Sequence, residues 1–365
     1  MHSGPRPPYD FRSDTVTLPT PAMMAAIAGA ALGDAARGDD PTVNALERLA
    51  ARLVGKDDAV FVPSGTMANL AALLAHEVRG GEVIVEATAH LYNSEGGGLS
   101  VVAGAVPRPL PGRRGALDPD DVRTAIRGGA DLALAPTRLV CVENTHNAAG
   151  GAVLPLSSLA ALHRVCRDAG IPVHMDGARL FNAAAFLDVP LAEICGHVES
   201  VWFALCKGLG GPVGAILAGD AAFMQRARRA VKMLGGGMRQ AGLIAAPALV
   251  ALAEPWPGLR RDHALARRLA DGLAAIDPSL VDAAGVQTNI VNCLVDRFAD
   301  RVAGDATAIV GALAERGVLA NGKRNRIRFV THAQVDEAAV EAAVAAVADV
   351  MRCGARRSDP VEVMP

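Results

Sequence analysis

Short apolar runs alternate with amphipathic stretches from about residue 59 to residue 219. Apolar runs bounded by Gly, Pro or polar residues are typical of buried strands, and an apolar period near 3.6 indicates helices. Their alternation is the pattern of a mostly parallel sheet covered by helices, so we predict an α/β fold. The predicted strands are 59–62, 82–86, 139–143, 173–176, 201–205 and 213–217, and the predicted helices are 43–54, 156–169 and 223–233, the first capped by Thr42.

The pattern changes near both ends of the chain, which predicts more than one domain. We predict an N-terminal arm and interface segment over 1–40, with its first 12 Pro-rich residues flexible. A large domain over 41–255 follows, then a small α+β domain over 256–353 and a loose tail over 354–365. In the small domain we predict a long charged helix over 256–276, strands 289–294 and 326–330, and helices 302–316 and 334–351.

Composition and charge narrow the class of protein. The 365 residues are 51% hydrophobic and 20% charged, with a formal net charge of −2, which argues against general affinity for nucleic acid or an anionic membrane. The most apolar long run, 241–253, is too short to span a bilayer, and the N-terminus has no apolar signal core. The six cysteines form no CxxC pair and no metal-ligand spacing, so we expect reduced thiols, a cytoplasmic location and no metal.

Lys207 and Asp176 carry the first indication of chemistry. Lys207 lies between two apolar runs, where its amine is poorly solvated and can attack a carbonyl to form a Schiff base. Asp176 ends an earlier apolar strand and is followed at once by glycine. An acid and a lysine at strand ends suit pyridoxal 5'-phosphate (PLP), because the acid can keep the pyridine nitrogen protonated. Taken alone, the position of Lys207 is more typical of a surface lysine in a hairpin turn.

Further polar residues follow other predicted strands. Ser64, Gly65 and Thr66 open a helix, where backbone N–H groups and a hydroxyl can bind a phosphate, although an N-cap without a ligand has the same sequence. His90 follows the next strand and could stack on a cofactor ring, although a loop histidine usually has no such role. Ligands gather at the carboxyl ends of strands in such sheets, so we expect these residues to meet at one edge.

With these residues in hand, the chain resembles the low-specificity L-threonine aldolases, PLP enzymes of aspartate aminotransferase-like fold. The resemblance runs from Phe11 to about residue 350 and implies PLP-dependent fold type I, with a mostly parallel seven-stranded sheet and a small C-terminal α+β domain. It rests on Arg-Ser-Asp-Thr-Val-Thr at 12–17, Gly-Asp-Asp-Pro-Thr-Val-Asn at 38–44, Pro-Ser-Gly-Thr-Met-Ala-Asn at 63–69, Glu-Asn-Thr-His-Asn at 143–147, Asp-Gly-Ala-Arg-Leu at 176–180, Lys-Gly-Leu at 207–209, Gly-Gly-Gly-Met-Arg-Gln at 235–240 and Arg-Phe-Val-Thr-His at 328–332.

The resemblance implies a reaction and a set of residue roles. The reaction is cleavage of the Cα–Cβ bond of a β-hydroxy-α-amino acid to glycine and an aldehyde, with His90, or a water that it holds, as the suspected base. The implied assembly is a homo-oligomer, a dimer of dimers with the active site shared across an interface. The implied cofactor residues are Lys207, Asp176, Arg179, Gly65, Thr66 and His90, with Lys232 and Arg239 from a neighbouring subunit, and the implied substrate residues are Ser13, Arg328 and Arg179.

Three positions depart from the family pattern. Arg37 stands where the family usually has a tyrosine, Ala133 aligns with a histidine thought to reach the substrate hydroxyl, and Cys206 replaces a serine before Lys207. Arg37 could favour an acidic substrate such as 3-hydroxyaspartate, or it could point into an interface salt bridge. Because the departures at Arg37 and Ala133 touch the substrate end, Cα racemisation and β-elimination stay open as alternatives. A non-catalytic PLP-binding protein is a further alternative.

Overall fold

The computed structural model describes residues 8–253, 256–295, 306–323 and 325–353. Its contacts divide the chain into two compact units, one over Leu18–Trp256 and the other formed by the segment that ends at Thr17 together with the chain from Pro257. The N-terminal segment therefore belongs to the same unit as the C-terminal residues. The proposed role of residues 1–40 at an interface stays a prediction, and the tail over 354–365 lies outside the described residues.

A seven-stranded sheet forms the centre of the larger unit. Only β10 runs antiparallel to its neighbours, and all the other neighbouring strands are parallel. The predicted mostly parallel α/β sheet is thereby confirmed. In spatial order the strands are β2 (Asp58–Val62), β10 (Ala215–Gly219), β9 (Ser200–Ala204), β8 (Val173–Asp176), β7 (Thr137–Glu143), β3 (Glu82–Glu86) and β4 (Val106–Leu110).

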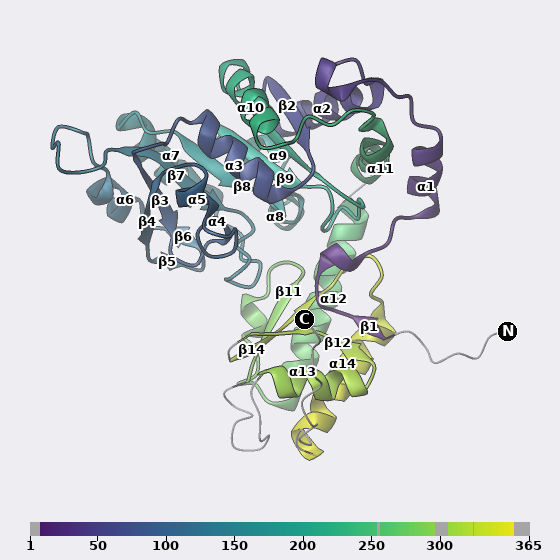
Figure 1. The fold of residues 1–365 in the computed structure, drawn as a ribbon. Helices are drawn as coiled ribbons and strands as arrows, with labels where there is room; N and C mark the ends of the chain where they lie inside the picture. The colour runs from purple at the N-terminus through teal and green to yellow at the C-terminus, as the bar shows by residue number, and fades with distance from the viewer. Residues whose placement is uncertain (1–7, 254–255, 296–305, 324, 354–365) are drawn as a thin grey trace. The chain divides into compact units, whose positions relative to one another are not determined.

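Burial on both faces explains why these strands have near-continuous apolar sequences. Every residue of β3, β8, β9 and β10 is buried, as expected when helices cover both sides of a parallel sheet. Helices α3 (Gly65–Ala75) and α10 (Ala221–Met233) pack with β2, β9 and β10 in one apolar cluster (Figure 1). The alanines of α3 let this helix approach the sheet closely.

Helix α2 (Pro41–Val54) begins earlier than predicted. Its N-cap is Asp40, whose side chain accepts hydrogen bonds from the backbone N–H groups of Thr42 and Val43. Pro41 occupies the first turn, where a missing N–H costs nothing. Thr42 is therefore inside the helix and not its cap, and its hydroxyl donates to the Ala31 carbonyl at 2.7 Å.

The larger unit also contains shorter helices and a hairpin around the sheet. Helix α7, predicted to end at residue 169, ends at residue 168. The remaining elements are α1 (Pro21–Ala28), η2 (Ala35–Arg37), α4 (His90–Asn93), α5 (Gly98–Val101), α6 (Pro119–Ala125), α7 (Leu156–Asp168), α8 (Leu180–Leu187), α9 (Leu191–Cys195), α11 (Gly242–Ala253), β5 (Gly112–Arg113) and β6 (Ala116–Leu117).

The second unit has its own apolar core, in which the Phe11 and Phe329 rings meet edge to face at 5.9 Å. The N-terminal residues are less free than predicted, because β1 (Tyr9–Asp10) pairs in parallel with β12 (Val318–Leu319). The predicted strands and helices are present, although residues 302–305 lie outside the described part. The other elements are η1 (Asp14–Val16), α12 (Trp256–Ile276), η3 (Ala283–Gly285), β11 (Ile290–Leu294), α13 (Ala306–Glu315), β13 (Asn321–Lys323), β14 (Arg326–Val330) and α14 (Glu337–Cys353).

Within the described residues, no single helix is long and apolar enough to cross a membrane, and one broken pair, α11 with α12, passes by length and composition alone.

Candidate active site

The predicted cofactor residues lie at one edge of the large sheet. Asp176 is the last residue of β8, and Lys207 comes three residues after β9 ends at Ala204. His90 begins α4, four residues after the end of β3. Because β3, β8 and β9 run in the same direction, their carboxyl ends share this edge, where such sheets bind ligands.

A buried asparagine connects the lysine side of this edge to the acid. The Lys207 ammonium lies 5.7 Å from the centre of the Trp202 ring, within cation–π range. The Trp202 indole N–H donates to Oδ1 of Asn69 at 2.6 Å, and Nδ2 of Asn69 donates to Oδ2 of Asp176 at 3.0 Å. The other Asp176 oxygen accepts from the backbone N–H of Ala178 at 3.1 Å. Donors thus fix both oxygens of a carboxylate that is 3% exposed.

His90 joins the same network through Glu95. Glu95 Oε1 accepts from Asn69 Nδ2 at 2.7 Å and lies 2.9 Å from His90 Nδ1. The hydrogen bond to Glu95 raises the pKa of His90 against the opposing effect of burial. Because Nδ1 faces an acceptor, it carries the proton in the neutral ring, and Nε2 is the nitrogen that can exchange a proton with a substrate.

Glu143 supports the histidine from the end of β7. One of its oxygens accepts from the His90 backbone N–H at 2.6 Å, and the other accepts from the Asn147 N–H at 2.8 Å. Burial, reinforced by the negative charge of Asp176, raises the pKa of Glu143. Ligand atoms of His90, Glu95 and Asp176 lie within 4.8 Å of one another, a spacing that a cation could also use. The amide and imidazole N–H donors between them identify the group as a hydrogen-bonded network.

The turn predicted to bind a phosphate forms the N-terminus of α3, as expected. Ser64 caps α3, with its hydroxyl accepting from the Met67 N–H at 3.2 Å, and Ser64 and Thr66 are exposed. A Cβ on Gly65 would lie only 2.3 Å from the Trp202 ring, so glycine is required for the turn to pack there. The N-terminus of an eleven-residue helix therefore presents N–H groups and hydroxyls to solvent, next to a tryptophan that contacts the lysine.

Unpaired buried polar atoms support a ligand at this edge. Among the described residues, Asn144 Nδ2, Thr145 Oγ1 and Glu95 Oε2 are buried without a hydrogen-bond partner. Such atoms are rare in native proteins and call for an explanation. All three belong to segments that follow β7 or β3 at the carboxyl edge. Together with an amine, an acid and a helix N-terminus, they fit PLP, whose polar ring substituents, phosphate and bound substrate need such partners.

The three predicted substrate residues are divided between the two units of the chain. Arg179 caps α8, is buried, and donates from Nη1 to Asn147 Oδ1 at 3.4 Å, which places it beside the β7 end. Ser13 and Arg328 belong to the other unit. There Arg328 Nη2 donates to the carbonyl of Arg12, the residue before Ser13, at 3.3 Å. The two predicted substrate residues are therefore brought to each other within that unit, and their role stays a prediction.

Two arginine side chains lie beside the Asp34 carboxylate. The Asp34 carboxylate pairs with Arg239 at 3.1 Å and with Arg37 at 3.5 Å, and the backbone N–H of Ala35 donates to the Arg239 carbonyl at 2.8 Å. These ion pairs lower the pKa of Asp34, with Arg239 the stronger partner. The Arg37 side chain is 78% exposed, so its cation remains accessible.

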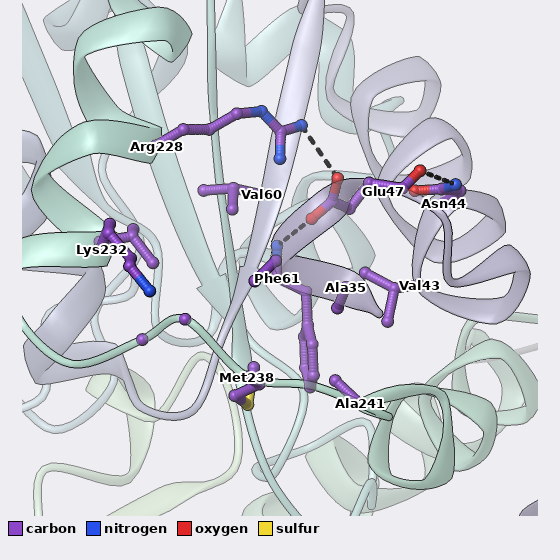
Figure 2. A pocket seen from close by; sticks show the side chains of 15 residues that line it. Ala35, Val43, Asn44, Glu47, Val60, Phe61, Arg228, Lys232, Met238 and Ala241 are labelled. Carbon is purple, nitrogen blue, oxygen red and sulfur yellow. Dashed lines mark hydrogen bonds and ion pairs between the residues drawn. The ribbon is translucent and has the colours of Figure 1, made fainter. Parts of the chain in front are cut away.

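Lys232 lines a cavity of about 500 Å³ beside this group. Figure 2 shows the cavity between α10 and α2, with Arg228 of α10 paired to Glu47 of α2 at 2.9 Å and Lys232 on the same wall as Arg228. Gly237 and Met238 of the glycine-rich segment form another part of the lining. Lys232, Arg37 and Arg239 thus lie on the segments 34–38 and 232–239, and their contribution to a neighbouring subunit stays a prediction.

The alignment of Ala133 with a substrate-contacting histidine stays a prediction. Ala133 is exposed in the loop between α6 and β7, where its N–H donates to Asp131 at 2.9 Å. This loop precedes β7, so it lies at the opposite edge from the carboxyl end that carries Glu143. An alignment places a residue along the chain, but the direction of the strand decides which edge the residue borders. Cys206 is partly buried next to the apolar cluster of α3.

Sequence reasoning missed three residues of the network: Asn69, Glu95 and Trp202. Asn69 lies four residues after Gly65, about one helical turn, so the two face the same side of α3. Trp202 is two residues before the end of β9 and shares a strand face with Ala204. Helical and strand periodicity could have identified these faces, whereas the loop position of Glu95 carries no comparable signal.

Comparisons with known proteins show which proteins this chain is similar to. The model of the family described as β-eliminating lyase matches residues 10–295. The chain is 40% identical over 333 residues to low-specificity L-threonine aldolase 1 of Arabidopsis thaliana, which covers 89% of this chain and 91% of the relative. It is 41% identical over 327 residues to the low specificity L-threonine aldolase of Escherichia coli strain K12, with 89% and 94% covered. A solved structure of Leishmania major threonine aldolase shares the fold, with a TM-score of 0.78, 21% identity, and 94% and 100% of the two chains covered.

Proposed function

The chain belongs to the β-eliminating lyase family, as a PLP-dependent lyase of the low-specificity L-threonine aldolase type, and from this premise we propose how its residues perform the reaction. The activity is cleavage of a β-hydroxy-α-amino acid between Cα and Cβ, giving glycine and an aldehyde. The observation that carries the proposal is the contact path from Lys207 through Trp202 and Asn69 to Asp176. It places an amine and a fixed carboxylate on one edge of the sheet.

Bound PLP supplies a protonated pyridine ring that accepts the electron pair released when the Cα–Cβ bond breaks. In this proposal Lys207 holds the cofactor covalently, and Asp176 keeps the pyridine nitrogen protonated. Gly65 and Thr66 would bind the phosphate at the start of α3, and the partly exposed His90 ring would stack on the cofactor ring. Lys232 and Arg239 complete the phosphate site in a second copy of the chain.

His90 is the best candidate for moving the proton. Its Nδ1 is held by Glu95, so Nε2 can take the hydroxyl proton directly or through a water. The raised pKa of His90 means that the ring is neutral, and able to act as a base, only toward the alkaline side of its ordinary range. Ser13, Arg328 and Arg179 bind the substrate carboxylate, where a guanidinium can form two parallel hydrogen bonds.

A glycine-release assay over a panel of β-hydroxy amino acids, with both diastereomers of each, tests the activity. We expect glycine and the matching aldehyde in equal amounts, and a loss of at least about 10³-fold in Lys207→Ala, because removing a covalent catalyst eliminates the route. His163→Leu, at a histidine of α7 paired with Glu199 at 3.1 Å, is a matched control that should keep the rate. Uptake of solvent deuterium at Cα with the side chain retained, and no aldehyde, would instead identify a racemase.

Arg37 is proposed to shift substrate preference toward an acidic side chain such as that of 3-hydroxyaspartate. Its guanidinium is largely exposed and only loosely paired with Asp34, which supports an available cation. Arg37→Ala should lower the ratio of hydroxyaspartate to threonine cleavage by about three- to tenfold, the size of one exposed charge contact. An unchanged ratio would leave Arg37 as an interface residue.

The finer aspects of assembly and location are also proposals. A homo-oligomer, with the active site shared across an interface, is supported by the separate gathering of Lys232, Arg239 and Arg37 on segments that differ from the sheet edge. A small amino-acid substrate fits the family, and we expect no nucleic-acid or membrane partner. A cytoplasmic location is supported by five of the six cysteines, which are free thiols: Cys141, Cys166, Cys195, Cys206 and Cys293.

A further inference from the structure

A line of buried polar side chains runs beneath the active site along the interface between α3 and the sheet. His76 Nε2 lies 2.7 Å from Ser200 Oγ, which lies 2.8 Å from His174 Nδ1. His174 Nε2 lies 3.2 Å from Oδ1 of Asn69, the residue that donates to Asp176. None of these contacts is required by the proposed reaction, although they cross an otherwise apolar layer.

Strand and helix periodicity places these residues on facing surfaces. In β8 and β9, His174 pairs with Ser200 and Asp176 pairs with Trp202, two residues further along each strand. Since side chains two apart share a strand face, all four point to the same side of the sheet. Asn69 and His76 lie seven residues apart, about two turns of α3, so that both face the sheet from the helix.

Trp202 determines the direction of every hydrogen bond in the line. An indole N–H can only donate, so the atom of Asn69 that faces Trp202 is its carbonyl Oδ1, and Nδ2 faces the carboxylates. His174 must then donate from Nε2 to Oδ1, which leaves its Nδ1 to accept from the Ser200 hydroxyl. Ser200 in turn accepts from Nε2–H of His76. All N–H and O–H groups therefore point from His76 toward Asp176.

Burial keeps both histidines in the neutral form that this direction requires. Desolvation lowers the pKa of His174 to about 3 and that of His76 to about 4. A neutral imidazole has one N–H donor and one acceptor nitrogen, so it can continue the line of aligned hydrogen bonds without carrying a charge. Aligned hydrogen bonds polarise one another, so the donor at the end of the line is stronger than an isolated amide N–H.

We propose that His174, supported by Ser200 and His76, acts through Asn69 as a positioning residue that fixes the Asp176 carboxylate for the cofactor nitrogen. The inference rests on the proposed function in one respect, the role of Asp176 as the partner of that nitrogen. His174 touches neither cofactor nor substrate. His174 holds the Asn69 amide in one orientation and strengthens the hydrogen bond that Asn69 Nδ2 donates to Asp176 Oδ2. The side of the Asp176 carboxylate that faces away from Asn69 stays available to the cofactor nitrogen.

The first test reads the imidazoles of the PLP-free protein labelled with ¹⁵N-histidine. We expect His174 to be neutral with its proton on Nε2 throughout pH 5–8, because Trp202 imposes that tautomer through Asn69. A proton on Nδ1, or an imidazolium signal in that range, would overturn the proposal. This measurement needs no cofactor, so it separates the inference from the proposed function.

The second test measures PLP affinity from quenching of Trp202 fluorescence in the PLP-free protein. His174→Leu should weaken binding about tenfold, the size of one net hydrogen bond, and His174→Gln should recover it to within about threefold, since its amide can still donate. Ser200→Ala and His76→Leu should have successively smaller effects, because each is one step further from Asp176. His163→Leu, outside the line, is the control that should leave affinity unchanged.

The pattern of these affinities decides between positioning and simple packing. If His174→Leu melts at a lower temperature but binds PLP like the wild type, the line has only a structural role and the proposal is wrong. Equal losses in all three positions would contradict it as well. If His174→Leu does not fold, the imidazole spectrum of the wild type and the His174→Gln affinity still decide. Failure of the wild type itself to bind PLP would refute the proposed function and leave the tautomer test standing.

Discussion

Two buried asparagines, one in each unit, donate to an aspartate and differ in what holds their carbonyl oxygen. In the larger unit, Asn69 Oδ1 accepts from Trp202 and His174 while Nδ2 donates to Asp176 and Glu95. In the other unit, Asn289 Nδ2 donates to Asp14 and to the Thr331 carbonyl, both at 3.1 Å. Its Oδ1 is buried without a hydrogen-bond partner among the described residues.

Asp176 and a buried acid of the second unit, Asp262, differ in the same way. Donors meet both oxygens of Asp176. Asp262, near Asp14, has a buried Oδ1 without a partner in the described part of the chain. Burial, with the charge of Asp14, raises the pKa of Asp262 to about 7. The comparison teaches that burial alone protonates a carboxyl, and that a site which needs an anion must supply donors.

The largest difference should appear in activity. Asp176→Ala should lower kcat/KM for threonine by about 10²–10³-fold, the usual loss when a charge aimed at the reacting system is removed. Asp262→Asn should change it by less than about threefold at pH 6, because Asn has the shape of the protonated acid. Glycine release at 25 °C measures both variants. Equal losses would break the comparison.

The second largest difference should appear in the stability of the protein when each of the two asparagines is replaced. Asn69→Leu removes the donor to two buried carboxylates and should lower the free energy of unfolding by about 3–5 kcal/mol, since stranded charged groups are costly. Asn289→Leu removes fewer contacts and should cost about 1–3 kcal/mol. Thermal and urea unfolding of the PLP-free variants would show the order. A larger effect at Asn289 would mean that the contacts of Asn69 are replaceable.

The pH dependence of stability should distinguish the acids in a smaller range. Folded Asp262 keeps its proton up to about pH 7, whereas the unfolded carboxyl loses it near pH 4. The folded state therefore binds the extra proton in between, so this group destabilises the protein progressively as pH rises from 4 to 7. Asp262→Asn should add about 1–3 kcal/mol at pH 8 and almost nothing at pH 4. Melting temperatures across this range test the sign.

The smallest effect should come from the hydrogen bond between Glu95 and His90. Because Glu95 raises the pKa of His90, the pair stabilises the fold below the ordinary histidine pKa, and this contribution is lost as pH rises through the raised value. Glu95→Gln should move the His90 pKa downward, as followed by NMR titration of the PLP-free protein. A pKa that stays raised would assign the effect to Asp176 or Glu143 instead.

Local pattern predicted much of this site because each residue follows a buried strand. The sequence predicted strands over 173–176 and 201–205, and the structure has them at Val173–Asp176 and Ser200–Ala204. A parallel sheet collects the ends of such strands at one edge. The turn proposed to bind the phosphate was predictable for the same local reason, since Ser64 caps the helix that begins at Gly65. For Ala133, the sequence did not show which end of β7 its loop borders, and the structure places that loop before β7 begins at Thr137. The prediction of a flexible arm was wrong for Tyr9–Asp10, because the strand that pairs with these residues lies about three hundred residues further along the chain.

The sequence by itself determined which side chains follow the strands: Lys207, Asp176 and His90 have their places because apolar runs set strand limits and chain direction. Only the tertiary structure decided how these residues are held. Trp202 meets Asp176 through the register of β8 on β9, and Asn69 reaches both because α3 packs over that pair. Register and helix placement depend on the whole core, which no local pattern encodes, so the anchored amide beneath Asp176 appeared only in three dimensions.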